Sequence, residues 1–243
     1  MENLLILCAI ILAIYFYRKN KKEKAAKQKL QKNPIPKYPP VPPVPPKPPT
    51  PIIPLDDVSF DYEPSISNIG EYLVIDTETD GLRELTREPN ILRIAWMLFD
   101  KDLKLVSKQL YVHRCEGVTD HGLKFISMSR EELESGISME EILEKLSIDL
   151  ANAQFTVAHN VDFHLDLIRL EYKNRGQKVP KALFKKNGYC TVLNNREIFG
   201  KYAKLKDVCE YYLGFRYSGN FNTEKEAMIV AECFFYTMGF KKK

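Results

Sequence analysis

The sequence predicts a mixed β-sheet covered by helices, in the α/β or α+β class. Three β-rich segments follow one another in the middle of the chain, and helical and extended patterns alternate after them. Strands in succession followed by a helix–strand–helix run are typical of a sheet with helices on its faces. The length of 243 residues allows one ordinary domain with extensions.

The chain begins with an apolar segment, residues 4–17, which is about 14 residues long. A spanning helix needs roughly 17–25 residues, and the three preceding residues together with snorkelling lysines make such a span feasible. Glu2 precedes the segment and basic residues follow it, which favours an uncleaved anchor with the rest of the chain cytoplasmic. We therefore predict a membrane anchor at residues 1–17 and a single-pass membrane protein with a cytoplasmic globular domain. A buried core helix is the alternative.

Residues 18–33 form a basic segment that contains eight lysines and arginines against one acidic residue, Glu23. Such a tract next to an anchor is attracted to anionic lipid headgroups. The remainder of the chain is net acidic once this segment is set aside. The basic isoelectric point therefore does not indicate a basic groove for nucleic acid.

A proline-rich linker is predicted at residues 34–56. Twelve of the fifteen prolines lie between residues 34 and 54, which favours an extended polyproline II spacer. The alternative is a binding motif, because Pro42, Pro45 and Lys47 fit the pattern of an SH3 ligand and imply an SH3-like partner. The globular domain is predicted at residues 57–240.

Within this domain, residues 72–75 are predicted as a short buried strand. Residues 138–152 are predicted as an amphipathic helix, with Ser138 as its cap and Glu141 completing a capping box. The remaining predicted elements are strands at residues 90–100, 104–114 and 154–158 and helices at residues 160–174, 205–213 and 224–238.

Two carboxylates stand at the end of the first predicted strand. Asp76 and Glu78 are separated by one residue, so an extended backbone places them on the same side. Like charges that close are costly, and a divalent cation with oxygen ligands is the usual remedy. The alternative is a strand end followed by a solvated acidic turn.

Several segments together resemble the DEDD, or DnaQ-like, 3′–5′ exonucleases. VIDTETDGL (residues 74–82) is similar to the first motif of that family, and VAHNVDFHLDLI (residues 157–168) is similar to the second. Cys190-Thr191 and LKDVCEYYLG (residues 205–214) resemble the segments that follow, and residues 221–235 stand where the third motif belongs. The resemblance covers residues 72–235.

The resemblance implies a ribonuclease-H-like fold and phosphodiester hydrolysis at the 3′ ends of single-stranded DNA or RNA. Four carboxylates of the family hold two metal ions, Mg²⁺ or Mn²⁺, which activate a water and stabilise the in-line displacement. A histidine, or a tyrosine in a sister branch, assists deprotonation of that water.

Three positions depart from the family pattern. Asp76 and Glu78 match the first motif, but His164 stands where the second motif has aspartate. Glu226 replaces the aspartate of the third motif, and Phe221 replaces its histidine. Loss of general-base assistance costs roughly 10²–10⁴-fold in rate.

The aspartates beside His164 do not restore the second motif. Asp162 and Asp166 each lie two residues away on the predicted helix. Two residues correspond to about 200° of rotation, so both face away from the position of His164.

We therefore predict a weak, membrane-anchored, metal-dependent 3′–5′ exonuclease. The resemblance assigns both catalysis and metal binding to Asp76, Glu78, Glu226 and His164. The alternative is a catalytically inactive exonuclease-fold module that binds nucleic acid or a protein partner.

Overall fold

The computed structural model describes residues 50–67, 69–82, 88–184, 187–200, 202–219 and 222–241. The predicted anchor at residues 1–17 and the basic segment at residues 18–33 lie outside the described residues. The same holds for the proline-rich segment up to residue 49, including the SH3-ligand pattern.

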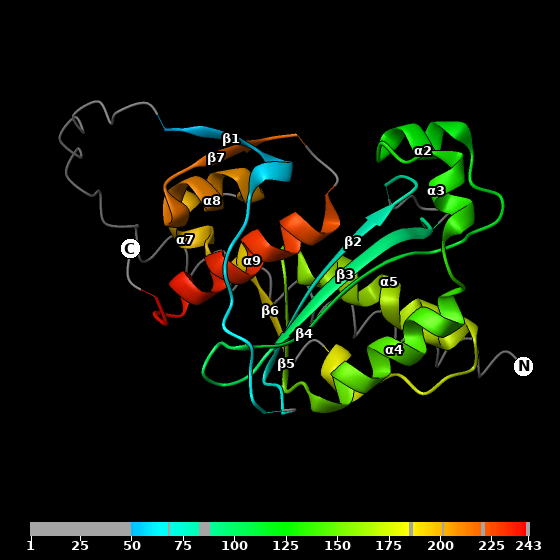
Figure 1. Cartoon of the computed structure of the whole chain (residues 1–243), viewed down its shortest axis with the longest axis horizontal. Coiled ribbons are helices and arrows are strands. Elements are labelled where there is room, and N and C mark those ends of the chain that lie inside the picture. The colour runs from blue at the N-terminus through cyan, green and yellow to red at the C-terminus, as the bar shows by residue number, and fades with distance from the viewer. Residues whose placement is uncertain are drawn as a thin grey trace, which may run out of the picture. The chain divides into compact units, whose positions relative to one another are not determined.

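A five-stranded sheet forms the centre of the domain, with the strand order β4-β3-β2-β5-β6 (Figure 1). The neighbours β2, β3 and β4 are antiparallel, whereas β5 runs parallel to β2 and β6 runs parallel to β5. The strands are β2 (Tyr72–Thr79), β3 (Ile91–Phe99), β4 (Leu105–Val112), β5 (Phe155–Ala158) and β6 (Gly188–Cys190). This arrangement confirms the predicted mixed sheet.

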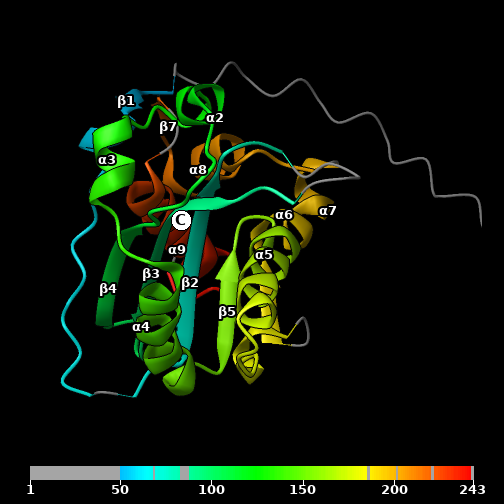
Figure 2. The same ribbon diagram turned by 90° about the vertical axis from the view of Figure 1, so that its right-hand side faces the viewer.

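Helices cover both faces of the sheet, as Figure 2 shows. On one face, Leu73 and Ile75 of β2 pack in a core with α4 (Met139–Asn152) and α5 (Val161–Asn174). On the other face, Val74 packs against α9 (Thr223–Thr237). The alternation of side chains along a strand explains why adjacent residues of β2 enter different cores.

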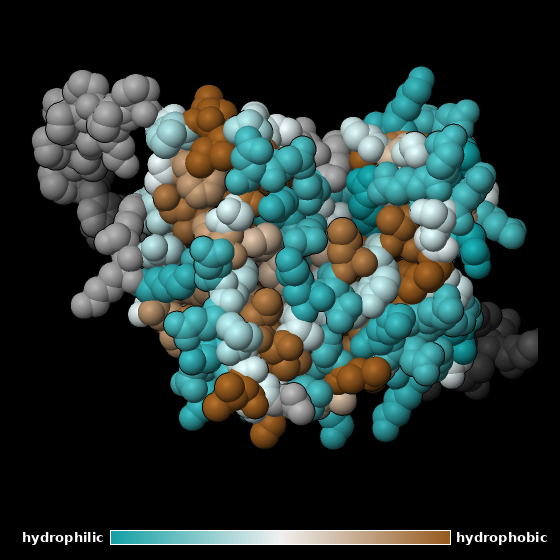
Figure 3. All heavy atoms as spheres, viewed as in Figure 1, coloured by the Kyte–Doolittle hydropathy of each residue, from teal (hydrophilic) through white to brown (hydrophobic). Residues whose placement is uncertain are grey.

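The outer surface over α9 and the β4 edge is mostly hydrophilic, with apolar side chains in small separate groups (Figure 3). This pattern is expected where each helix buries one face against the sheet and exposes the other. Another helix of the C-terminal half, α8 (Leu205–Leu213), packs on α9.

A second, two-stranded sheet corrects the predicted end of the linker. β1 (Ile52–Pro54) pairs in parallel with β7 (Arg216–Ser218), and the short helix η1 (Leu55–Asp57) follows it. Leu55 is buried in a core with residues of α8 and α9. Proline is tolerated in β1 because both strands of a two-stranded sheet are edge strands. The domain therefore begins before residue 57.

Several short helices were not predicted. They are α2 (Asp120–Phe125), α3 (Arg130–Ser135), η2 (Lys181–Leu183), α6 (Thr191–Asn194) and α7 (Arg196–Phe199). Helices of one or two turns are too short for their apolar periodicity to stand out. Thr119 caps α2 and Ser129 caps α3, because the side chain of each accepts a hydrogen bond from a backbone N–H at the start of its helix.

The predicted capping box of α4 is confirmed. The Ser138 hydroxyl accepts from the backbone N–H of Glu141, whose carboxylate accepts from the backbone N–H of Ser138. We expect Ser138→Ala to lower the free energy of unfolding by about 1 kcal/mol, because the backbone N–H of Glu141 loses its acceptor. Urea titration measures the change. Ser135→Ala, at the exposed end of α3, is the control, and an equal loss there would contradict the assignment.

The predicted membrane localisation is corrected by one finding. Across the described ranges, no helix has both the length and the apolar character that crossing a bilayer requires.

Candidate active site at the end of strand β2

Strand β2 directs two acidic side chains to the α9 face of the sheet. Asp76 lies opposite Ala95 of β3, and Glu78 lies opposite Arg93. Only 9 % of Asp76 and 5 % of Glu78 is exposed. The strand alternation predicted from the sequence therefore holds, and it places both carboxylates in the interior rather than in a solvated turn.

Helix α9 brings a third carboxylate to the same place. Glu226 lies in the first turn of α9 and lines a cavity of about 250 Å³ together with Asp76 and Glu78. The side chains of Leu82, Phe125, Ile126 and Phe163 contribute an apolar part of the wall. Three of the four predicted site residues thus share one cavity.

The electrostatics of Asp76 reflect this convergence. Burial raises the pKa of Asp76 well above its ordinary value, and the negative charges of Glu226 and Glu78 raise it further. The backbone N–H of Thr77 opposes the rise by hydrogen bonding. Burial and the neighbouring carboxylates therefore disfavour a negative charge on Asp76.

Arg93 partly compensates Glu78 and was not predicted as a site residue. Its Nη1 donates to Glu78 Oε2 at 2.9 Å, and the two side chains are 12 % and 4 % exposed. Burial still raises the pKa of Glu78, although Arg93 and the Thr223 hydroxyl act to lower it. Glu78 Oε1 and Thr223 Oγ1 are buried without a hydrogen-bond partner of normal geometry.

Tyr217 of β7 contacts the third carboxylate. Its hydroxyl donates to Glu226 Oε1 at 3.3 Å, and only 4 % of the residue is exposed. Burial, followed by the charge of Glu226, raises the pKa of Tyr217 above its ordinary value. The tyrosine is therefore a hydrogen-bond donor that orients Glu226.

His164, which the family resemblance assigned to metal binding, forms hydrogen bonds through both of its ring nitrogens. Burial lowers its pKa to about 4, so the ring is neutral near pH 7. The carbonyl of His159, at 2.9 Å, can only accept, which makes Nε2 the protonated nitrogen. Nδ1 then accepts from the Thr77 hydroxyl at 2.8 Å. In this arrangement both ring nitrogens are engaged, and no lone pair is left for a cation.

The ring of His164 nevertheless lies beside the carboxylates. Its Nε2 is 3.6 Å from Asp76 Oδ1. The residue is absent from the lining of the cavity that the three carboxylates share. A neutral imidazole therefore stands next to Asp76 where the family pattern has a fourth negative charge.

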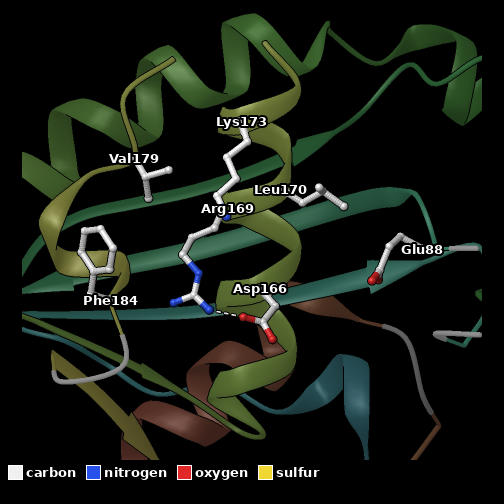
Figure 4. Close-up of a pocket in the computed structure, with 7 residues that line it drawn as sticks. All are labelled: Glu88, Asp166, Arg169, Leu170, Lys173, Val179 and Phe184. Atoms are coloured by element: carbon white, nitrogen blue, oxygen red, sulfur yellow. Dashed lines mark hydrogen bonds and ion pairs between the residues drawn. The ribbon is translucent and has the colours of Figure 1, made fainter. Parts of the chain in front are cut away.

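Asp166 points elsewhere, as the helical rotation predicts. It pairs with Arg169, one turn further along α5, and lines a separate cavity of about 490 Å³ (Figure 4). Lys173 and Phe184 contribute to the same cavity. This larger cavity contains none of the predicted site residues, so Asp166 does not replace the missing carboxylate.

Whether these residues suit a divalent cation depends on their donor atoms. Asp76, Glu78 and Glu226 supply hard oxygen donors, and Oε1 of Glu78, which is buried without a hydrogen bond of normal geometry, is the kind of atom that a cation satisfies. The donor atoms are therefore of the kind that a divalent cation binds. The set does not fit a pair of metal ions, because His164 offers no free lone pair as a fourth ligand. Among the described residues, no group of three or more His, Cys, Asp or Glu is gathered closely enough to hold an ion.

The remaining altered position, Phe221, lies outside the described residues. Asn222, the next residue, caps α9 by accepting from the backbone N–H of Lys225. The loss of the motif histidine thus remains an observation of the sequence.

The chain is similar in sequence to nucleases. A sequence model of the family described as Exonuclease matches residues 73–216. A DNA polymerase III PolC-type of Mycoplasmopsis pulmonis (strain UAB CTIP) is 26 % identical over 119 residues. That stretch is 49 % of this chain, and it spans only 8 % of the length of the relative.

Solved structures share the fold at low identity. A 3′-exonuclease solved in a study of 3′-end-specific recognition of histone mRNA stem-loop has a TM-score of 0.57 and 12 % identity, over 70 % of this chain and 81 % of that one. The nuclease domain of 3′hExo, a DEDDh family member bound to rAMP, has a TM-score of 0.55 and 12 % identity, over 70 % of this chain and 92 % of that domain.

Escherichia coli Exonuclease I in complex with a dA16 oligonucleotide is similar over 68 % of this chain and 40 % of that one, with a TM-score of 0.55 and 10 % identity. These likenesses show the fold, and the family match covers more than half of the sequence. The chain belongs to the exonuclease family.

Proposed function

We propose that this chain removes nucleotides from the 3′ ends of single-stranded nucleic acid by slow, metal-dependent phosphodiester hydrolysis. The observation that carries the proposal is the convergence of Asp76, Glu78 and Glu226, from β2 and α9, on one cavity. Three carboxylates grouped in one cavity have no structural benefit of their own, since like charges in a poorly solvated site repel one another. Their grouping is explained by a cationic ligand.

In this proposal, Asp76 and Glu226 hold one Mg²⁺ or Mn²⁺ ion, with Oε1 of Glu78 as a third donor. A divalent cation bound there would polarise a phosphate oxygen and lower the pKa of a bound water. Tyr217 keeps Glu226 oriented through its hydrogen bond. His164, whose ring nitrogens are engaged by Thr77 and His159, is assigned the support of β2 instead of a place among the metal ligands.

The apolar wall of the cavity suits a nucleobase. Phe125 is 38 % exposed and Leu82 is 74 % exposed, and both line the cavity beside the carboxylates together with Phe163. Aromatic and aliphatic side chains bind bases of any sequence through stacking and apolar contact. We therefore place the terminal base against these residues, with its phosphate directed to Asp76 and Glu226.

The second candidate function is binding of a 3′ end without hydrolysis. Two observations favour it, because His164 supplies no negative charge and Arg93 already pairs with Glu78. A site with fewer free carboxylates binds cations more weakly, and catalysis through metal ions weakens with it.

A nuclease assay with the full chain separates the two candidates. 5′-labelled single-stranded DNA and RNA are incubated with Mg²⁺ or Mn²⁺, and we expect a ladder shortened from the 3′ end, strongest with Mn²⁺ and abolished by a chelator. Glu226→Gln should lower the rate on the order of 10²-fold, because a carboxylate of the charged site is lost.

Glu224→Gln is the matched control, since Glu224 lies in the same helical turn and pairs with Lys108 outside the cavity. It should leave the ladder unchanged. Absence of a ladder, with phosphorothioate-protected strands still bound, would establish the second candidate. Absence of both would exclude nucleic acid as the ligand and would direct attention to a protein partner.

A further inference from the structure

We propose that Arg93 is a built-in counter-ion of the carboxylate site, which holds Glu78 and thereby weakens cation binding. This inference rests on the proposed function and concerns how strongly that same site takes up its metal. It adds a positioning residue that lies on β3, the strand beside the one that carries Asp76 and Glu78.

The position of Arg93 follows from the register of the sheet. β2 and β3 are antiparallel, and Glu78 lies directly opposite Arg93, so both side chains project from the same face. Nη1 of Arg93 is 2.9 Å from Glu78 Oε2. Both side chains are almost fully buried, which leaves little water to screen their attraction.

The guanidinium is also fixed from outside β2. Its Nε and Nη2 donate to Glu132 Oε1 of α3 at 2.9 and 2.7 Å, and its Nη1 donates to the carbonyl of Ile126, at the end of α2, at 3.2 Å. A planar guanidinium held at several donors has little freedom to turn away. Arg93 is therefore anchored by α2 and α3 independently of its contact with Glu78.

Arg93 and Glu78 face different cavities. Glu78 lines the cavity shared with Asp76, whereas Arg93 lines a second cavity of about 370 Å³ that also includes Glu132 and Thr223. The ion pair thus connects the acidic cavity to its neighbour. A cation that approaches Glu78 meets a carboxylate with one oxygen already bound and a positive charge directly behind it.

Competition for Glu78 follows from this arrangement. A carboxylate that binds a metal with both oxygens must release other partners of those oxygens, and Arg93 already holds Oε2 of Glu78. The positive charge of Arg93 also opposes any further positive charge placed near Oε2. Arg93 therefore supplies part of the neutralisation that a metal ion would otherwise supply, and the acidic site tolerates the absence of metal.

The test measures Mn²⁺ binding to the full chain by electron paramagnetic resonance of the free ion, without any substrate. Arg93→Met removes the charge and keeps an apolar side chain, and we expect the Mn²⁺ affinity to rise on the order of tenfold. Arg93→Lys keeps a positive charge and should leave the affinity near that of the wild type. Arg175→Met removes an arginine that pairs with Glu140 and Glu171 away from the site, and it controls for net charge.

Glu78→Gln completes a double-mutant cycle and keeps the proposal testable if Arg93→Met does not fold. In the wild-type background we expect Glu78→Gln to change the Mn²⁺ affinity less than threefold, because the Glu78 carboxylate is already paired with Arg93. In the Arg93→Met background it should remove the tenfold gain, and this double variant leaves no unpaired buried charge.

Three outcomes would overturn the inference while leaving the proposed function intact: an unchanged or lower affinity in folded Arg93→Met, an equal gain in Arg175→Met, or a tenfold loss in Glu78→Gln alone. If neither the wild type nor any variant binds Mn²⁺ and no ladder forms, the metal-dependent function itself fails.

Discussion

Replacing Asp76 by asparagine is expected to abolish 3′-end hydrolysis and to make the folded domain more stable. The rate should fall by about 10²–10³-fold, because the variant loses a charged donor at the point where the three carboxylates meet. The fold should gain about 1 kcal/mol, because burial and the charges of Glu226 and Glu78 disfavour the ionised form of Asp76. A neutral amide of the same shape avoids both costs.

The sign of the pH dependence provides a second readout. The raised pKa of Asp76 means that the folded state holds its proton more tightly than the unfolded state. Stability therefore declines as pH rises from the ordinary aspartate range towards the folded pKa, and this decline should be smaller in Asp76→Asn.

Urea titrations in the absence of metal measure the stability change, and the ladder assay measures the rate. Asp100→Asn is the opposite control. Although burial acts against it, hydrogen bonds from Ser65 and the backbone of Lys104 and Asp102 lower the pKa of Asp100. That variant should lose stability and keep its activity. A stability loss in Asp76→Asn, or retained hydrolysis, would refute the role given to Asp76.

Acidification is expected to destabilise the domain through His164. Burial lowers the pKa of His164 to about 4, against an ordinary value of 6.5. Between these two pKa values the unfolded chain binds a proton at His164 and the folded chain does not. The free energy of unfolding therefore falls as the pH drops from about 6.5 to about 4. A difference of this size corresponds to a loss on the order of 3 kcal/mol at the acid end.

The neighbouring His159 adds to the effect. Burial, and then the positive charge that His164 would carry, lower the pKa of His159 to about 4 as well. Urea unfolding between pH 4 and pH 7.5 measures the slope. His164→Gln should remove about half of it, because one of the two histidines no longer takes up a proton on unfolding. An unchanged slope in that variant would show that another group causes the acid sensitivity.

The predictions that succeeded depend on local patterns. The strand predicted at residues 72–75 and the capping box at Ser138 are set by residues a few positions apart, and both appear in the structure, although the strand continues through Asp76 and Glu78 to Thr79. The place of Glu226 beside them required α9 to cross the sheet face, which only the family resemblance implied. The alternation of side chains along a strand can be predicted from a sequence. The strand residues against which a helix packs cannot be predicted in the same way.

The features that the sequence did not predict depend on pairing between distant segments. Arg93 was a readable signal, as the one charged residue in the apolar strand ILRIAWMLF, but its partner depends on the register of β2 and β3. His164 was predicted as a metal ligand because the sequence indicated its helix but not the residues that contact its ring. Thr77 and the carbonyl of His159, which engage its ring, come from β2 and from the end of β5.

The pairing of β1 with β7 connects the first strand of the domain to the carboxylate site. Ile53 lies beside Tyr217 in the parallel ladder, and Tyr217 donates to Glu226. The path from β1 to a carboxylate of the site is two contacts long, so a displacement of β1 acts on the strand that orients Glu226.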